Sequence, residues 1–342
     1  MQKYDVVIVG AGPAGLMCAE TLVGTGLSVI VLEKNDVFGK KVCAGGLTRK
    51  DLSLLDVPDE IIEHKVDRTA VIASKGRSGA DAPQPFLFTV DRIKFGTWYK
   101  ERVEKAGIEV RKNSKVTSVD DTKVVINGNE EMGYKFLVGA DGFFSVVRKY
   151  LRLPQEKRLA GLQYIIPAKN VDPRLYIYLN AKRFHAWYGW KFPHEGAYAV
   201  GCCADPDIVP PPVLKKNFSL WLQENGIDIS EAEYQAYPIS YDYRGFKFGN
   251  VFLAGEAAGL ASGFTGEGIY QSLVSGKTVA KTILDGNYHS DEMEAVIKYN
   301  SIQEKVLDFL VKAGPFRSVV HSMIVGLLNN KWVKSKIHKS FS

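Results

Sequence analysis

Short runs of apolar residues recur along this chain, and each lies beside a glycine or a helical pattern. Runs of this kind are typical of strands that helices bury on both faces, so we expect them to join one sheet of an α/β layer. They occupy residues 5–9, 28–32, 108–111, 135–139 and 250–254.

A second set of runs is richer in β-branched and aromatic residues, and several of them alternate apolar with polar positions. Alternation predicts strands that are buried on one face, as in a largely antiparallel sheet. These runs occupy residues 68–73, 85–90, 161–168, 174–180, 196–203 and 234–243. The three prolines at 210–212 predict a loop within this second unit.

A glycine-rich turn follows the first strand, and a helical pattern continues from it to about residue 24. Glycines let such a turn tighten and let a pyrophosphate approach the backbone, while the helix N-terminus favours its negative charge. Glu33 ends the next strand, where it would accept a ribose hydroxyl, and we expect Lys34, the next residue, to contact the cofactor as well. The turn consists of Gly10, Ala11, Gly12, Pro13, Ala14 and Gly15. This order of strand, turn, helix and acid predicts a dinucleotide-binding site.

Three later segments resemble motifs of the flavoprotein superfamily that includes aromatic hydroxylases and geranylgeranyl reductases. Residues 137–148 resemble its internal Asp-Gly motif, residues 249–259 its late flavin-contacting motif, and residues 90–92 the site of its flavin-contacting arginine. The resemblance implies FAD as the cofactor and implies contacts to it from Arg92, Asp141, Gly255 and Glu256. Glu256 stands where the family usually has aspartate, so its hydrogen bond to the ribityl chain would be displaced by one methylene.

The resemblance also covers the glycine-rich loop at residues 41–47, and it implies further cofactor contacts by Ala44, Gly45, Gly266, Gly268 and Ile269. Residues 262–268 directly follow the late motif, so we expect them to line the isoalloxazine ring and to lead into a helix over 269–284. No strand precedes this segment, so it does not predict a second dinucleotide site. The electron donor, a nicotinamide or a redox protein, stays open.

One further motif resembles the geranylgeranyl reductases more than the hydroxylases of this superfamily. Tyr188, Trp190, Phe192 and Pro193 fit the YxWxFP pattern associated with substrate binding in geranylgeranyl reductases. An isoprenoid chain needs an apolar, aromatic-lined channel. The alternative is that the aromatic residues simply pack the second sheet, as aromatic-rich strands usually do. The set that could line a channel is Tyr164, Tyr176, Tyr178, Phe184, Trp187, Tyr188, Trp190 and Phe192.

Cys43 lies in the glycine-rich loop beside two lysines, and in the resembling family this loop approaches the flavin. Either a catalytic thiol or a small buried side chain is compatible with that position. We therefore expect an FAD-dependent reductase that saturates carbon–carbon double bonds of an isoprenoid, geranylgeranyl-type lipid or diphosphate, with Cys43 or a water as the proton route. The alternatives are a flavin-dependent monooxygenase or halogenase, and a prenyl-binding carrier without catalysis.

The strand pattern and the motifs together predict a Rossmann-type FAD-binding domain, a second and mostly antiparallel β substrate domain, and C-terminal helices. Because the two kinds of strand interleave along the chain, the FAD-binding domain must be discontinuous. We assign residues 1–66, 92–155 and 245–285 to it, 67–91 and 156–244 to the substrate domain, and 286–342 to the C-terminal helical region.

Charge separates the C-terminal segment from the rest of the chain. The net charge is +6, and residues 309–342 contain six basic residues and no acidic one. Apolar residues interleave with these cations, which suits either a helix packed on the body or contact of residues 316–342 with a membrane surface.

Features that the sequence lacks indicate its cellular location and exclude some partners. It shows neither a signal peptide nor a run of 18 apolar residues, which predicts a cytoplasmic protein, peripheral at most on the inner face of a membrane. The four cysteines have no metal-ligand spacing, and we expect no metal. We also expect no nucleic-acid partner.

Overall fold

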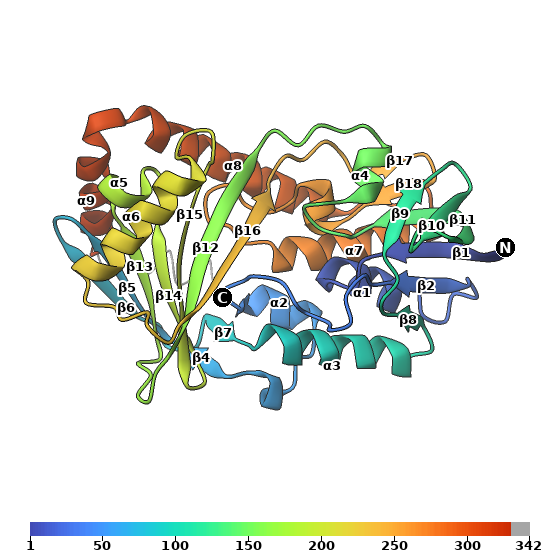
Figure 1. Cartoon of the computed structure of the whole chain (residues 1–342), viewed down its shortest axis with the longest axis horizontal. Coiled ribbons are helices and arrows are strands. Elements are labelled where there is room, and N and C mark those ends of the chain that lie inside the picture. The colour runs from blue at the N-terminus through green and yellow to red at the C-terminus, as the bar shows by residue number, and fades with distance from the viewer. Residues whose placement is uncertain (330–342) are drawn as a thin grey trace.

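The computed structural model describes residues 1–329, and the first sheet is built from the apolar runs near the N-terminus (Figure 1). Its parallel strands follow the order β18-β11-β1-β2-β8, and three further strands add antiparallel pairs. The strands are β1 (Gln2–Val9), β2 (Val29–Leu32), β8 (Glu109–Arg111), β9 (Val116–Val119), β10 (Lys123–Ile126), β11 (Glu130–Gly139), β17 (Lys247–Phe248) and β18 (Val251–Leu253). As predicted, the five apolar runs lie in one sheet.

Helices cover both faces of this sheet, which explains why its central strands are apolar on both sides, as in the second half of β1 and the whole of β2. Val6 and Ile8 of β1 pack toward α1 (Pro13–Thr21), α3 (Arg92–Lys105) and α7 (Ile269–Leu284). Val7 of the same strand packs in a second core with α4 (Val146–Tyr150) and the first half of α8 (Asp291–Lys312). The helix predicted over 269–284 is confirmed.

The second sheet has the strand order β16-β12-β15-β14-β13-β5-β6 and is antiparallel except for the pair of β13 and β5. Two helices cover one of its faces, α5 (Ala181–Phe184) and α6 (Pro211–Glu224). The strands are β5 (Arg68–Ala73), β6 (Arg77–Asp81), β12 (Arg158–Pro167), β13 (Arg174–Leu179), β14 (Gly189–His194), β15 (Ala197–Ala204) and β16 (Glu233–Ser240). The predicted fold class, with a mostly antiparallel second sheet, is confirmed.

Two predictions about this part of the chain are wrong. The run at 85–90 does not join the second sheet, because β7 (Leu87–Thr89) pairs with β3 (Gly46–Thr48) and β4 (His64–Val66) in a separate sheet. The prolines at 210–212 open α6 rather than form a loop: Pro210 caps the helix and the next two occupy its first positions. A proline there loses no hydrogen bond, because the first backbone N–H groups of a helix have no partner within it.

The C-terminal helices connect the two main sheets, which lie at opposite ends of the molecule (Figure 1). The first half of α8 packs with the first sheet through Met293 and Val296, and its second half packs with the second sheet through Leu307 and Leu310. After η3 (Gly314–Phe316), α9 (Arg317–Leu328) lies against β5 and β6. The short helices α2 (Arg49–Leu54), η1 (Asp59–Ile61) and η2 (Gly255–Ala258) complete the described elements.

Candidate active site

The glycine-rich turn between β1 and α1 depends on glycine at two of its positions. Gly10 has φ +104°, and a Cβ on it would lie 2.4 Å from the carbonyl oxygen of Ala140. A Cβ on Gly15 would lie 1.9 Å from the carbonyl oxygen of Gly10, so only glycine lets α1 pack this closely. By contrast, a Cβ on Gly12 would have no neighbour within 4 Å among residues 1–329. The turn therefore leaves open space at the helix N-terminus, where a phosphate is favoured.

Glu33 lies beside this turn, as the sequence predicts for the acid that follows the second strand. Its carboxylate accepts hydrogen bonds from the backbone N–H of Ala11 at 3.0 Å and of Asn35 at 2.9 Å. The side chain of Asn35 donates a third at 2.7 Å. Lys34, the next residue, is exposed.

Two side chains of the expected flavin contacts have buried polar atoms without a partner among the described residues. They are Nε and Nη1 of Arg92 at the start of α3, and Oδ1 of Asp141 after β11. Burial raises the pKa of Asp141, and its other oxygen accepts a hydrogen bond from the N–H of Val146 at 2.7 Å. Because an unpaired buried polar atom costs about 1–3 kcal/mol, such atoms mark places where a bound ligand completes the pairing. The residues present fit FAD on this ground.

Glu256 lies on η2 and is almost fully buried, with 8% of its surface exposed. One carboxylate oxygen accepts the N–H of Ser240 at 3.1 Å, and the other forms an ion pair with Lys41. Gly142 adjoins the same carboxylate, since a Cβ on it would lie 3.7 Å from Oε2. The internal Asp-Gly motif, the late motif and the loop at 41–47 therefore meet here. The ion pair was not predicted, because its only signal in the sequence is a lysine in a loop that, by resemblance, approaches the flavin.

The loop that carries Cys43 is held by hydrogen bonds to three successive carbonyl groups. Gln163 of β12 donates to Cys43 at 3.2 Å, His194 of β14 donates to Ala44 at 2.9 Å, and the N–H of Val90 donates to Gly45 at 2.9 Å. The Cys43 thiol is half-buried, and the N–H of Gly45 donates to its sulfur at 3.4 Å. These hydrogen bonds fix the loop to the second sheet, in addition to the ion pair between its Lys41 and Glu256 of η2.

The aromatic motif is the strand β14 and the residue before it, and its alternate positions share one face of the sheet. Tyr188 donates a hydrogen bond to the carbonyl oxygen of Thr265, in the loop that follows the late motif. Trp190 lies over Gly201, where a Cβ would come within 2.4 Å of the indole, and its buried Nε1 has no partner among the described residues. The Phe192 ring lies against Gly46 of the cysteine loop. Pro193 is buried at a position of the opposite face.

Other aromatic residues that could have lined a channel belong instead to the core of the second sheet. Tyr178 and Phe184 contact Trp221 of α6 at ring-centroid distances of 4.8 and 5.4 Å, and Tyr164 contacts Phe218 at 5.8 Å. All three rings therefore pack against α6. For these three residues the expectation of a substrate channel is wrong, and the alternative of sheet packing holds.

The loop at 262–268 lies next to the aromatic motif. Trp187 donates from Nε1 to the carbonyl oxygen of Gly263 at 3.0 Å, beside the bond from Tyr188 to Thr265. Gly266 has φ +68°, and Gly268 and Ile269 form the start of α7. The structure therefore brings the predicted cofactor segment and the predicted substrate segment into direct contact.

Two carboxyl groups, one beside this loop and one within it, were not predicted from the sequence. Burial raises the pKa of Asp51 to about 6, and one of its oxygens is buried without a partner among the described residues. Desolvation and the nearby Asp51 raise the pKa of Glu267. The only sequence signal was a capping pattern, in which Thr48 and Asp51 close the first turn of α2.

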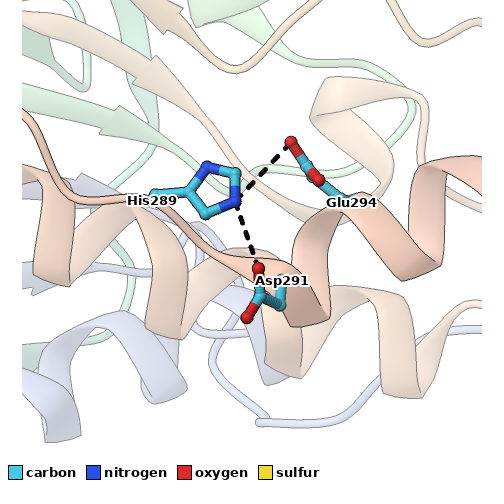
Figure 2. A group of neighbouring side chains, drawn as sticks. All are labelled: His289, Asp291 and Glu294. Carbon is cyan, nitrogen blue, oxygen red and sulfur yellow. Dashed lines mark hydrogen bonds and ion pairs between the residues drawn. The ribbon is translucent and has the colours of Figure 1, made fainter.

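A group of potential metal ligands lies elsewhere, at the start of α8 (Figure 2). His289 pairs with Asp291 at 3.1 Å and with Glu294 at 3.8 Å, and all three side chains are exposed. The ion pairs account for their closeness. None of the helices within residues 1–329 has both the length and the hydropathy of a membrane span.

Comparisons with known proteins agree with this geometry. The family model described as "FAD binding domain" matches residues 3–283. The chain is 29% identical to a geranylgeranyl diphosphate reductase of Rhodobacter capsulatus, over 82% of this chain and 75% of that protein. It is 26% identical to digeranylgeranylglycerophospholipid reductase 2 of Methanopyrus kandleri, over 86% of this chain and 81% of that protein. A solved structure from Thermoplasma acidophilum, of a geranylgeranyl bacteriochlorophyll reductase-like protein, superposes with a TM-score of 0.80 at 22% identity, covering 98% of this chain and 96% of that one.

Proposed function

Because the chain belongs to the family defined by this FAD binding domain, we propose that it is a reductase that saturates carbon–carbon double bonds of an isoprenoid lipid or diphosphate. The family and the named reductases support FAD as the cofactor and an FAD-dependent oxidoreductase activity. The specific part of the proposal is that the substrate is an isoprenoid and that its carbon–carbon double bonds are reduced.

The observation that carries the specific part is the position of the aromatic motif. Tyr188 contacts Thr265 in the loop at 262–268, which follows the late flavin motif. Phe192 contacts Gly46 in the loop at 41–47 that carries Cys43. Trp190 lies between them on the same face of β14. An apolar substrate held by these rings would lie beside both loops that the family resemblance assigns to the flavin. The names of the relatives, which include geranylgeranyl diphosphate reductase, support the same substrate class.

The residues of the chain supply position and proton control. FAD, when bound, supplies hydride transfer to an alkene carbon. An alkene without a neighbouring carbonyl offers nothing to polarise, so the aromatic face must orient it and exclude water. Arg92, Asp141 and the turn at 10–15 would hold the cofactor, and the Cys43 thiol is our candidate to pass a proton to the second carbon.

Two other functions predict different behaviour. A monooxygenase or halogenase shares this type of fold, and fold alone does not separate it from a reductase. A prenyl carrier would bind the isoprenoid without flavin, so its purified form would lack the yellow flavin absorbance.

The reductase is tested by mixing reduced holoenzyme anaerobically with geranylgeranyl diphosphate and following the flavin absorbance. We expect the oxidised flavin spectrum to return with the unsaturated substrate and not with a fully saturated analogue. Flavin that stays reduced, with isotopic oxygen appearing in the product once labelled oxygen is admitted, would reject the reductase in favour of the monooxygenase. The same assay, run with a nicotinamide or a reduced ferredoxin in place of chemical reductant, identifies the donor.

The C-terminal helices support contact with a membrane surface as part of this function. Four apolar residues on α9 and the turn before it are 51–70% exposed, while Arg317, His321 and Val325 are buried on the opposite side. The exposed residues are Phe316, Val319, Met323 and Leu327. An apolar face next to a basic segment suits the interface of an anionic membrane, from which a lipid substrate would come. The predicted contact covers 316–342, of which 330–342 lie outside the described residues.

A further inference from the structure

The loop that carries Cys43 is anchored by a pair of side chains that no motif points to. His194 ends β14, and Glu63 lies just before β4, 131 residues away in the sequence. His194 shares the face of β14 that carries Trp190 and Phe192. The pair therefore joins the candidate substrate strand to the cysteine loop.

The geometry of the histidine ring leaves it little freedom. Nδ1 lies 2.5 Å from Oε2 of Glu63, and Nε2 lies 2.9 Å from the carbonyl oxygen of Ala44. The side chains of His194 and Glu63 are 13% and 11% exposed. Since a carbonyl oxygen only accepts, Nε2 must carry a proton and donate it. Glu63 then shares a proton with Nδ1, which fixes the orientation of the ring as a carboxylate does for other functional histidines.

The ring also packs against the backbone next to Cys43. A Cβ on Gly45 would lie 2.9 Å from Cε1 of His194, so the ring contacts this glycine directly. The N–H of Gly45 is the donor to the Cys43 sulfur. Movement of the ring would thus shift Ala44 and Gly45 and, with them, the hydrogen bond at the thiol.

We propose that His194 and Glu63 are a positioning pair that fixes the Cys43 loop against the substrate-facing side of β14. The pair does not touch the reacting atoms and acts through Ala44 and Gly45. Its catalytic consequence rests on the proposed function, because it assumes that the Cys43 loop borders the reacting alkene.

The test compares His194→Ala, His194→Gln and Glu63→Gln in the FAD-bound protein. A glutamine at 194 can still donate its amide N–H to Ala44, whereas alanine cannot. We expect His194→Ala to lower kcat for geranylgeranyl diphosphate about tenfold with little change in KM, since misplacement of a reacting group affects the chemical step. We expect His194→Gln to recover most of kcat, and Glu63→Gln to fall between the two.

A second readout does not depend on catalysis. Hydrogen exchange of the backbone amides at 42–47, measured by mass spectrometry, should be faster in His194→Ala and close to native in His194→Gln. Glu195→Gln, at the exposed neighbouring residue, is the matched control and should change neither readout. The proposal would be overturned if His194→Ala kept the native exchange rate and the native kcat. It would also be overturned if His194→Gln exchanged as fast, and turned over as slowly, as His194→Ala. If native protein reduces no isoprenoid, the proposed function fails, and the exchange data still decide whether the pair positions the loop.

Discussion

Lys41 and Glu256 form an ion pair at the position where the resembling flavoproteins usually have aspartate. The side chain of Glu256 is 7% exposed, so removal of the lysine would leave a nearly buried carboxylate without its counter-charge. In this chain the longer acid, Glu256, therefore forms its ion pair with Lys41 of the loop at 41–47. Sequence motifs identified the acid but not its partner, because the two lie 215 residues apart.

We predict that Lys41→Met weakens FAD binding about tenfold, because the unpaired carboxylate would stand near the anionic cofactor. The measurement is titration of apoprotein with FAD, followed by flavin fluorescence. Lys40→Met, at the exposed neighbouring lysine, is the control and should leave the affinity unchanged. Equal dissociation constants for the Lys41 variant and native protein would mean that the ion pair has no part in holding the cofactor.

Cys43 differs from the other cysteines in its access to solvent. Cys18, Cys202 and Cys203 are fully buried, and burial raises the pKa of Cys203 to about 12. We therefore predict that brief treatment of the native protein with iodoacetamide modifies Cys43 alone, which peptide mass spectrometry would show. Cys43→Ser should abolish this labelling and lower the rate of isoprenoid reduction. Full reductase activity in the serine variant would remove the thiol from the proton route and leave water as the source.

At the scale of elements, the short apolar runs predicted the parallel strands, because burial on both faces leaves a continuous apolar run. Periodicity could not assign 85–90 to a sheet, since it reports exposure and not the pairing partner. The aromatic pattern of Tyr164, Tyr178 and Phe184 likewise shows that a face is buried, but α6 decides what covers it. The positioning of His194 by Glu63 depends on tertiary contact and has no local signal.

The attachment of α9 should depend on pH through His321. Its side chain is 1% exposed, and burial together with the nearby Arg317 lowers its pKa to about 4. Because the folded state disfavours protonation, stability is fully present above about pH 6.5 and is lost as the pH falls toward 4, by up to about 3 kcal/mol. Urea unfolding at about pH 7.5 and about pH 5 measures this loss.

A variant isolates this histidine from the other groups that titrate in the same range. We expect the free energy of unfolding of His321→Leu to depend less on pH than that of native protein. His289→Ala removes an exposed histidine and should retain the native dependence. If native protein and His321→Leu lose the same stability on acidification, the buried histidine does not set the pH response.

At the scale of the whole molecule, α8 and α9 bind the two sheets together on one side and expose apolar residues on the other. We predict that the protein floats with vesicles of phosphatidylcholine and phosphatidylglycerol, and less with phosphatidylcholine alone, in a salt-sensitive manner. The combined variant Val319→Ser, Met323→Ser, Leu327→Ser should reduce the bound fraction about fivefold, because it removes apolar area that would enter the interface.

The matched control for flotation is the combined variant Val23→Ser, Ile93→Ser, Val213→Ser, which alters exposed apolar residues away from α9. It should bind vesicles like native protein. An equal loss in both variants would contradict a specific membrane-facing side. A shift of native protein to a dimer, lost only in the α9 variant, would assign this face to self-association instead.

The mass of the product shows most directly whether this protein reduces an isoprenoid. Chemically reduced holoenzyme is incubated anaerobically with geranylgeranyl diphosphate, and the isoprenoid is analysed by mass spectrometry beside the Gly12→Val variant. A Cβ at position 12 would have no neighbour within 4 Å among the described residues, so the variant should fold. The valine side chain would point into the space left for the phosphates, so the variant should not bind FAD. We predict a gain of two hydrogens for each bond reduced by native protein, and no gain with the variant. An unchanged isoprenoid mass in the presence of bound, reduced FAD would contradict it.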